Sequence, residues 1–400
     1  MEQQLMQGAP PGPDGQVTLA NWRQSPFSKW GFRNLRNLVP TAAIAGATGS
    51  EVTPLREAWR DLGELDLVDA AGARLPAHRY LRAINVDGLV VLRRGELAYE
   101  LYDNGLEASR QHILFSVSKS VTGVLAGVLA DRGLLDPDRP AADYAPELKS
   151  SVYAGATVRH LLDMTVSIGF SEDYADPNGD MPAYRRAVGW DPGGPVGGAD
   201  LRGFLASQKT PGETAHGEVF HYVSPDTDTL GWVLERAGGA PFAQMLSDLI
   251  WRPMGAEREA WVTLDSFGAP RTAGGVCMTT RDLARFGEMM RRGGVANGRQ
   301  IAPAWWVDDI RSNGDRRAWE RGNFAAMGFP ARRYRSKWYL FDEETGAFGG
   351  AGIHGQWLYV CPTSEVVIAA FSSQPDAADI PYSVAWIANC KHIARELGAA

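Results

Sequence analysis

The most constraining feature of this 400-residue chain is a serine and a lysine three residues apart, at the start of a strongly apolar helical pattern. Ser116 and Lys119 are followed by aliphatic residues at helical spacing, and the pattern ends at Gly133. Side chains three positions apart share one face of a helix. The pattern therefore predicts a buried helix whose first turn holds a hydroxyl nucleophile beside its own base.

The choice of lysine at position 119 supports a chemical role for this pair. Lysine is scarce in this arginine-rich chain, and Lys119 alone has a serine three residues before it. Arginine keeps its proton in a protein, whereas a desolvated lysine can release one and act as a base. The simpler alternative is that Ser116 only caps the helix.

Composition and charge narrow the possible partners. The chain is 44% hydrophobic and 22% charged, as in globular proteins, and is long enough for one large domain or two. A net charge of −7 without a dense basic block argues against a nucleic-acid partner. The nearest basic run, Arg332-Arg333-Tyr334-Arg335, is expected to be a solvated turn. Because no apolar run spans a membrane and the N-terminus does not look like a leader, we expect a cytoplasmic protein.

Cysteines and histidines show no metal-binding pattern. Cys277, Cys361 and Cys390 lie far apart, without the paired spacing of a zinc or redox site, and are expected to be buried small hydrophobes. His216 and His221 are five residues apart, a poor match to the spacing of four that zinc-binding helices use. We therefore expect neither a metal nor another cofactor.

Two predicted hairpins enclose a helical middle. Residues 89–92 with 97–102, and 357–360 with 366–371, are apolar or alternating runs joined by short turns, and an amphipathic helix over 383–397 is expected to cover their sheet. Helical periodicity appears over 157–164, 200–207, 227–236, 242–252 and 280–292. We therefore expect an α/β protein: a sheet domain from 1–150 and 262–400, loosely ordered over 1–20, with a mostly helical domain inserted over 151–261.

Three other segments are candidates for the rest of a serine–lysine site. Tyr222 and Ser224 share one side of an extended segment that ends at a predicted helix cap, so the Tyr222 phenol could supply a proton, although a packing role is the alternative. The glycine-rich run 348–355 is predicted to be a strand that a substrate approaches closely, or else a bend in an edge strand. The Gly/Pro-rich loop 189–198, with Trp190, either lines a cleft or is a surface connection.

Together these segments resemble one superfamily. The order of S-x-x-K at Ser116–Lys119, Y-x-S at Tyr222–Ser224 and a late glycine-containing strand is similar to that of the penicillin-binding protein and β-lactamase serine hydrolases, especially the class C-like esterases. The resemblance covers about residues 85 to 395. It is strongest to the 6-aminohexanoate-dimer hydrolases, on Ser116-Val117-Ser118-Lys119-Ser120, Glu172-Asp173-Tyr174-Ala175-Asp176-Pro177, Tyr222-Val223-Ser224 and Gly352-Ile353-His354-Gly355-Gln356. The implied fold is an antiparallel sheet flanked by helices.

The resemblance also implies roles for individual residues. Ser116 would be the nucleophile, Lys119 its base, and Tyr222 the group that relays a proton to the leaving atom. The oxyanion would lie between the backbone N–H groups of Ser116 and Ile353. Tyr174 would contact the scissile amide from a loop. The implied substrate-binding surface also includes Ser224, Gly352, His354, Arg185 and Trp190.

Two departures from the superfamily pattern bear on the substrate. Gly350-Ala351-Gly352 replaces the K-T-G of β-lactamases, so the lysine that would bind a penicillin or peptide carboxylate is absent. The related amidases hold the substrate's ammonium end with an acidic residue, where this chain reads Ala183-Tyr184-Arg185-Arg186, and a basic side chain there would repel an ammonium.

The function that these observations imply is acyl-enzyme hydrolysis of small linear amides such as 6-aminohexanoate oligomers. A carboxylesterase of short acyl esters is the alternative, because esters need less protonation of the leaving group. A binding module that keeps the fold without activity is a remote third possibility. The expected partner is a small-molecule substrate, with no nucleic acid and no membrane, and the resemblance makes a homodimer plausible.

Overall fold

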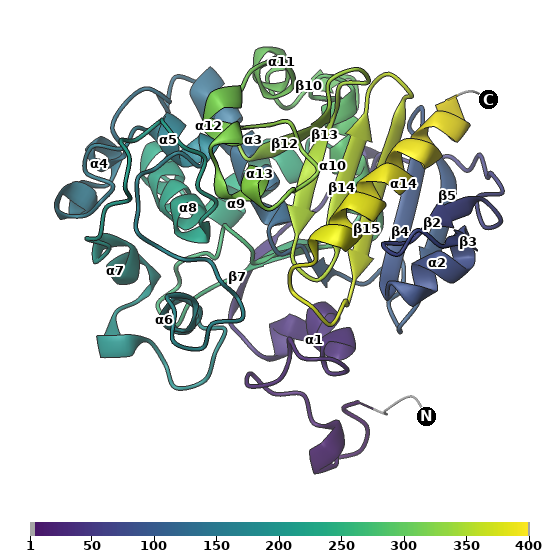
Figure 1. Ribbon diagram of the computed structural model, residues 1–400, viewed down its shortest axis with the longest axis horizontal. Coiled ribbons are helices and arrows are strands. Elements are labelled where there is room, and N and C mark those ends of the chain that lie inside the picture. The colour runs from purple at the N-terminus through teal and green to yellow at the C-terminus, as the bar shows by residue number, and fades with distance from the viewer. Residues whose placement is uncertain (1–4, 399–400) are drawn as a thin grey trace.

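The computed structural model describes residues 5–398, apart from the side chain of Val196, and its largest sheet is a seven-stranded antiparallel one, which lies beside a group of helices (Figure 1). The strand order is β11-β12-β13-β14-β15-β4-β5. The bounds are β11 Arg333–Arg335, β12 Trp338–Asp342, β13 Ala347–Gly352, β14 Gln356–Cys361, β15 Val366–Ser372, β4 Val86–Arg93 and β5 Glu96–Tyr102. The sheet thus joins the two predicted hairpins, which come from opposite ends of the sequence.

Smaller sheets lie around it. A four-stranded sheet has the order β1-β7-β8-β6, and β2 pairs with β3 and β9 with β10. The bounds are β1 Thr41–Ile44, β7 Ala260–Thr263, β8 Val276–Met278, β6 His112–Ile113, β2 Asp66–Val68, β3 Arg74–Pro76, β9 Val295–Ala296 and β10 Arg299–Gln300.

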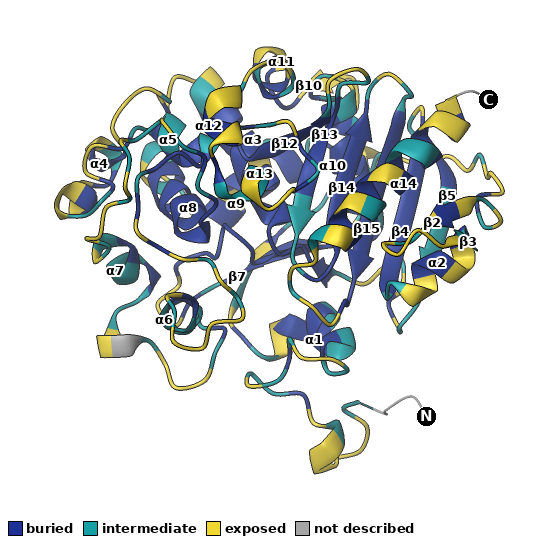
Figure 2. Cartoon of the chain, viewed as in Figure 1, coloured by how far each residue is buried: buried dark blue, intermediate teal, exposed yellow. Residues whose placement is uncertain are grey.

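Helices cover both faces of the large sheet, which explains its strongly apolar strands. On β15, Val367, Ala369 and Phe371 belong to a core shared with α3 (Val117–Asp131) and α10 (Thr280–Arg291). The alternate residues Ile368 and Ala370 belong to a second core, which α14 (Ile380–Gly398) and α2 (Ala77–Ala83) complete. Figure 2 shows the buried strands beneath the half-exposed α14.

The regular elements between residues 141 and 251 are all helices, joined by long loops. α8 (Ser224–Gly238) packs against α3 and is surrounded by shorter helices. These are α4 Ala141–Tyr144, α5 Val158–Asp163, α6 Met181–Ala187, α7 Leu201–Ala206 and α9 Phe242–Leu246, the last continued by a π-helical turn Ser247–Trp251. The other helices are α1 Ser28–Asn34, α11 Ala304–Ser312, α12 Arg316–Glu320 and α13 Asn323–Ala326, and 3-10 turns lie at Pro13–Gly15, Leu35–Asn37, Gly49–Glu51, Pro146–Ser150 and Val196–Gly198.

The structure confirms the predicted fold class, both hairpins and the predicted helices. The prediction of a solvated turn at 332–335 is wrong, because Arg333–Arg335 is strand β11, with Tyr334 buried and Arg335 paired with Asp163 and Asp309. β13 lies between β12 and β14, so the edge-strand alternative is also wrong.

The predicted domain boundaries stay a prediction. Within the segment predicted to be loose, residues 1–4 lie outside the described residues, whereas Val17 is buried against the core. No helix in the described part of the chain is long and apolar enough to cross a membrane.

Candidate active site

Ser116 lies at the start of α3, and an aromatic cluster fixes the residue before it, Phe115. Phe115, immediately before it, has a positive φ of 41°, a costly conformation for a bulky residue. Phe115 packs on Trp22, Phe32 and Trp190, with ring centroids 6.1, 5.0 and 6.0 Å away. Such backbone strain persists only where the surrounding packing enforces it, and it concentrates at functional sites. Here it directs Ser116 out of the strand and into the first turn of the helix.

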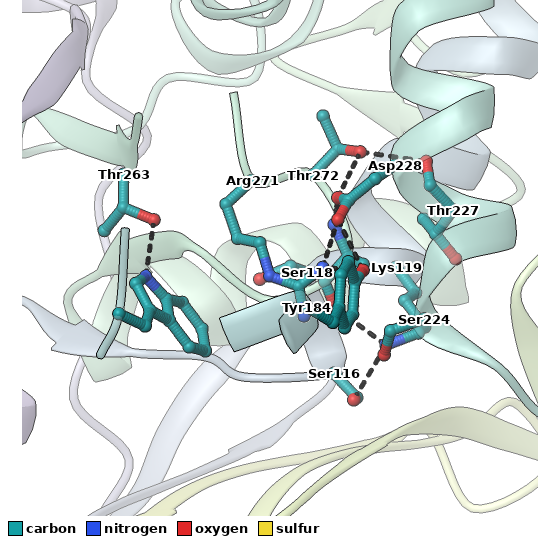
Figure 3. A network of polar contacts seen from close by, with 12 residues as sticks. Ser116, Ser118, Lys119, Tyr184, Ser224, Thr227, Asp228, Thr263, Arg271 and Thr272 are labelled. Atoms are coloured by element: carbon teal, nitrogen blue, oxygen red, sulfur yellow. Dashed lines mark hydrogen bonds and ion pairs between the residues drawn. The ribbon is translucent and has the colours of Figure 1, made fainter. Parts of the chain in front are cut away.

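Lys119 lies one turn into α3 and joins three segments of the site (Figure 3). Its Nζ donates to Ser116 Oγ and Ser224 Oγ, both at 2.9 Å, and to the Ala273 carbonyl at 2.8 Å. Burial lowers the pKa of Lys119 to about 7, although the Glu172 carboxylate opposes this shift. The amine is therefore neutral in a large fraction of molecules near neutral pH, and it lies where it can accept the Ser116 proton.

Ser224 is turned toward this network. Its hydroxyl accepts from Lys119 and donates to Glu172 Oε1 at 2.7 Å, and its backbone N–H donates to Glu172 Oε2. Glu172 Oε1 also accepts the Tyr174 hydroxyl. The predicted side-chain cap at this helix start is wrong, because no side chain of the 223–226 turn caps α8 and the Ser224 N–H is bound by Glu172 instead.

Asp228 fixes Ala273, whose carbonyl is the third acceptor of the Lys119 amine. It lies one turn after Ser224 on α8, and its carboxylate accepts the Ala273 N–H at 2.8 Å and the Tyr184 hydroxyl at 2.6 Å. Arg271 forms an ion pair with the same carboxylate. These contacts hold segment 271–273, and the carbonyl of its last residue, Ala273, accepts from Lys119.

Tyr222 covers the Ser116–Lys119 pair. Lys119 Nζ lies 5.0 Å from the centroid of the Tyr222 ring, and the Phe324 ring stacks on the same ring at a centroid distance of 4.5 Å. Burial and the Glu172 charge raise the pKa of the phenol, while hydrogen-bonding contacts with Ser116 and Tyr339 oppose the rise. Tyr222 therefore keeps its proton at neutral pH, as a proton donor requires.

The end of β13 lies directly against Ser116. A Cβ on Gly352 would be 3.0 Å from the Ser116 nitrogen and 2.8 Å from the Leu114 carbonyl, so only glycine allows this approach. The chain then turns at His354, which has a positive φ of 59° and is fixed by its Nδ1–H, which donates to the Gln374 carbonyl at 2.7 Å. Neither the Ser116 nor the Ile353 backbone N–H donates to an acceptor within residues 5–398.

Around Ser116 lies a cleft of about 1760 Å³. All the residues predicted for the site except Lys119 line it: Ser116, Tyr174, Arg185, Trp190, Tyr222, Ser224, Gly352, Ile353 and His354. Lys119 lies just beneath, buried. Of the Gly/Pro-rich loop, Trp190 reaches the wall, with an exposed fraction of only 4%.

Sequence reasoning missed several site residues because their partners are distant in the chain. Glu172 is 52 positions from Ser224, and Arg23 is 168 from Asp191. Asp228 carried a usable signal, since it follows Ser224 by four residues on one helix. Among residues 5–398, no group of three or more His, Cys, Asp or Glu side chains could hold a metal ion. Cys277, Cys361 and Cys390 are free and buried, as predicted.

Comparisons with known proteins agree with this geometry. The family described as Beta-lactamase matches residues 79–385. The 6-aminohexanoate-dimer hydrolase of Paenarthrobacter ureafaciens is 38% identical over 363 residues, which cover 90% of this chain and 89% of that protein. Esterase EstB of Burkholderia gladioli is 31% identical over 186 residues, covering 42% of this chain and 44% of EstB.

Solved structures extend the likeness to the fold. A protein of Bacillus anthracis described as a 6-aminohexanoate-dimer hydrolase superposes with a TM-score of 0.83 at 26% identity, over 97% of this chain and 99% of that one. A family VIII carboxylesterase gives a TM-score of 0.59 at 17% identity, over 79% and 95%. The chain therefore belongs to the beta-lactamase family and is a serine hydrolase.

Proposed function

We propose that this enzyme hydrolyses small linear amides through an acyl-enzyme formed on Ser116. The observation that carries the proposal is the 2.9 Å contact between Ser116 Oγ and the buried Lys119 amine, whose pKa is lowered to about 7. A desolvated lysine within hydrogen-bond reach of a serine is the arrangement that activates a hydroxyl without histidine. The 38% identity to a 6-aminohexanoate-dimer hydrolase supports linear amides as the substrate class.

In the proposed first half-reaction, neutral Lys119 takes the Ser116 proton as Oγ bonds to the amide carbon. The carbonyl oxygen becomes an oxyanion, which the Ser116 and Ile353 N–H groups bind. The C–N bond then breaks and the nitrogen leaves as an amine. Its proton comes from Tyr222, which Lys119 reprotonates.

In the second half-reaction, water attacks the ester carbon of the acyl-enzyme and loses a proton to Lys119. The Ser116 C–O bond breaks, Ser116 Oγ regains that proton, and a carboxylic acid leaves. Glu172 and Ser224 act as positioning residues, because they hold Lys119 and Tyr174 by the hydrogen bonds described above. One water, consumed in the second half-reaction, is the co-reactant that balances the two half-reactions.

The test is turnover of the 6-aminohexanoate linear dimer beside p-nitrophenyl hexanoate. We expect the wild-type enzyme to cleave both, and Ser116→Ala and Lys119→Met each to lose at least a hundredfold in kcat, the usual contribution of such groups. A melting temperature near that of wild type would show that each variant folds. Ester cleavage with an untouched dimer would make the enzyme a carboxylesterase, and unchanged turnover in Ser116→Ala would reject the nucleophile.

The proposal extends to the surroundings and the assembly of the enzyme. We expect the enzyme to work in the cytoplasm on a small-molecule substrate, and to form a homodimer. Sedimentation of the purified chain tests the second statement directly.

A further inference from the structure

Two arginines share one carboxylate at the wall of the cleft around Trp190. Arg23 and Arg185 both line the cleft, and both bind one carboxylate, that of Asp191. Arg185 Nε lies 2.9 Å from Asp191 Oδ2, and Arg23 binds Oδ1 and donates to the Trp190 carbonyl at 2.9 Å. Because two guanidinium groups share one carboxylate, the cluster of Arg23, Arg185 and Asp191 carries one uncompensated positive charge.

This charge is partly withdrawn from water. The side chains are about one-fifth exposed: 21% for Arg23, 20% for Arg185 and 19% for Asp191. Burial lowers the pKa of Arg23 and the neighbouring Arg185 lowers it further, while Asp191 opposes both effects. An unbalanced charge with restricted hydration attracts an anion more strongly than the same charge on an open surface.

The cleft is also lined by acidic residues, and among the described residues none of them forms an ion pair with Arg23 or Arg185: Glu172, Asp173, Asp180, Glu213, Asp376 and Asp379. The positive charge of Arg271 is balanced by the Asp228 carboxylate, with which it forms a buried ion pair. Asp180 keeps its negative charge, but it lies at the start of α6, about 7.5 Å along the helix axis from Arg185, where its Oδ2 accepts the Ser171 N–H at 2.8 Å.

We propose that the cluster of Arg23, Arg185 and Asp191 is a carboxylate-binding subsite, so that the enzyme prefers linear amides bearing a free carboxylate over those bearing an ammonium. The inference rests on the proposed amide hydrolysis and specifies its substrate. A guanidinium fork matches a carboxylate in two parallel hydrogen bonds, whereas an ammonium meets two like charges here. A carboxylate on either the acyl or the amine half has the required chemistry.

The test compares four amides of matched length. N-hexyladipamate carries its carboxylate on the acyl half and N-hexanoyl-6-aminohexanoate on the amine half, while N-hexylhexanamide is neutral and 6-amino-N-hexylhexanamide carries an ammonium. We expect kcat/KM for the preferred one of the two carboxylated amides to exceed that for the ammonium amide by about 10- to 100-fold. This is the range that hydrogen bonds between charged groups contribute. The carboxylated compound that is preferred identifies the half bound by the subsite.

Arg185→Gln should reduce this ratio at least fivefold. Arg186→Gln, on the same helix but outside the cleft, should leave it unchanged. Equal rates on all four amides, or a preference for the ammonium, would overturn the subsite.

A binding measurement keeps this inference separate from the proposed function. Titration of adipate and of 1,6-diaminohexane into the Ser116→Ala protein needs no turnover. Adipate binding that Arg185→Gln weakens supports the subsite even if none of the four amides is cleaved, a result that would count against the amidase proposal alone. Absence of adipate binding, or tighter binding of the diamine, would overturn the subsite whatever the turnover.

Discussion

Among single residues, Lys119 determines how activity should depend on pH. Only its neutral form can accept the Ser116 proton, so kcat/KM should fall about tenfold per pH unit below the pKa of about 7. The Glu172 charge raises that pKa. Glu172→Gln should therefore move the acid limb of the pH profile to lower pH, as well as reduce the rate through the lost contact with Ser224.

The control is Asp176→Asn, which removes an exposed carboxylate from the same loop. Its acid limb should coincide with that of wild type. A limb that stays in place in Glu172→Gln, or moves to higher pH, would contradict the coupling between Glu172 and Lys119.

At the scale of elements, the contact between the end of β13 and the start of α3 brings the two candidate oxyanion donors together. A Cβ added at Gly352 would meet two backbone atoms, which cannot rotate away as a side chain can. Gly352→Ala should therefore displace β13 from Ser116 and lower kcat by about 10²- to 10³-fold, the loss found when one oxyanion donor is removed.

Gly63→Ala is the matched control, because its added Cβ would lie 3.8 Å from the nearest atom, the Asp61 carboxylate. It should keep wild-type kcat. Wild-type activity in Gly352→Ala would contradict the proposed oxyanion site, and a large fall in melting temperature would show that the contact matters more for folding.

At the scale of the whole molecule, the N-terminal segment completes the site from outside the helical middle. Trp22 is fully buried, lies against Phe115 and Trp190, and donates its Nε1–H to the Trp190 carbonyl at 3.2 Å. Trp22→Ala should lower the free energy of unfolding by about 3–5 kcal/mol, the cost of removing a large core aromatic.

This loss is measurable by urea denaturation. Trp59→Ala, at a position that is 50% exposed, should change the free energy of unfolding by no more than about 0.5 kcal/mol. Equal effects of the two substitutions would show that the N-terminal segment is not part of the core.

Local patterns alone predicted much of this protein. The period of the apolar residues determined α3, α10, α14 and the two hairpins, because each buries a continuous apolar face. Ser116 and Lys119 were found because they lie three residues apart on one helix. The segment that holds Tyr222 was a candidate from its own pattern, whereas the resemblance to known hydrolases supplied Tyr174 and Ile353, which no local spacing links to Ser116.

Only the tertiary structure decided which distant groups meet. Glu172 reaches Ser224, Arg23 reaches Asp191, and Gly352 lies on Ser116, although the chain separates each pair by 52 residues or more. A charge or hydrogen-bonding group acts over a few ångströms in space, whereas a sequence motif records only neighbours along the chain. The sequence by itself therefore singled out the proposed nucleophile and its proposed base, while the folded chain determined the surroundings that lower the pKa of that lysine and the charged groups that line the cleft.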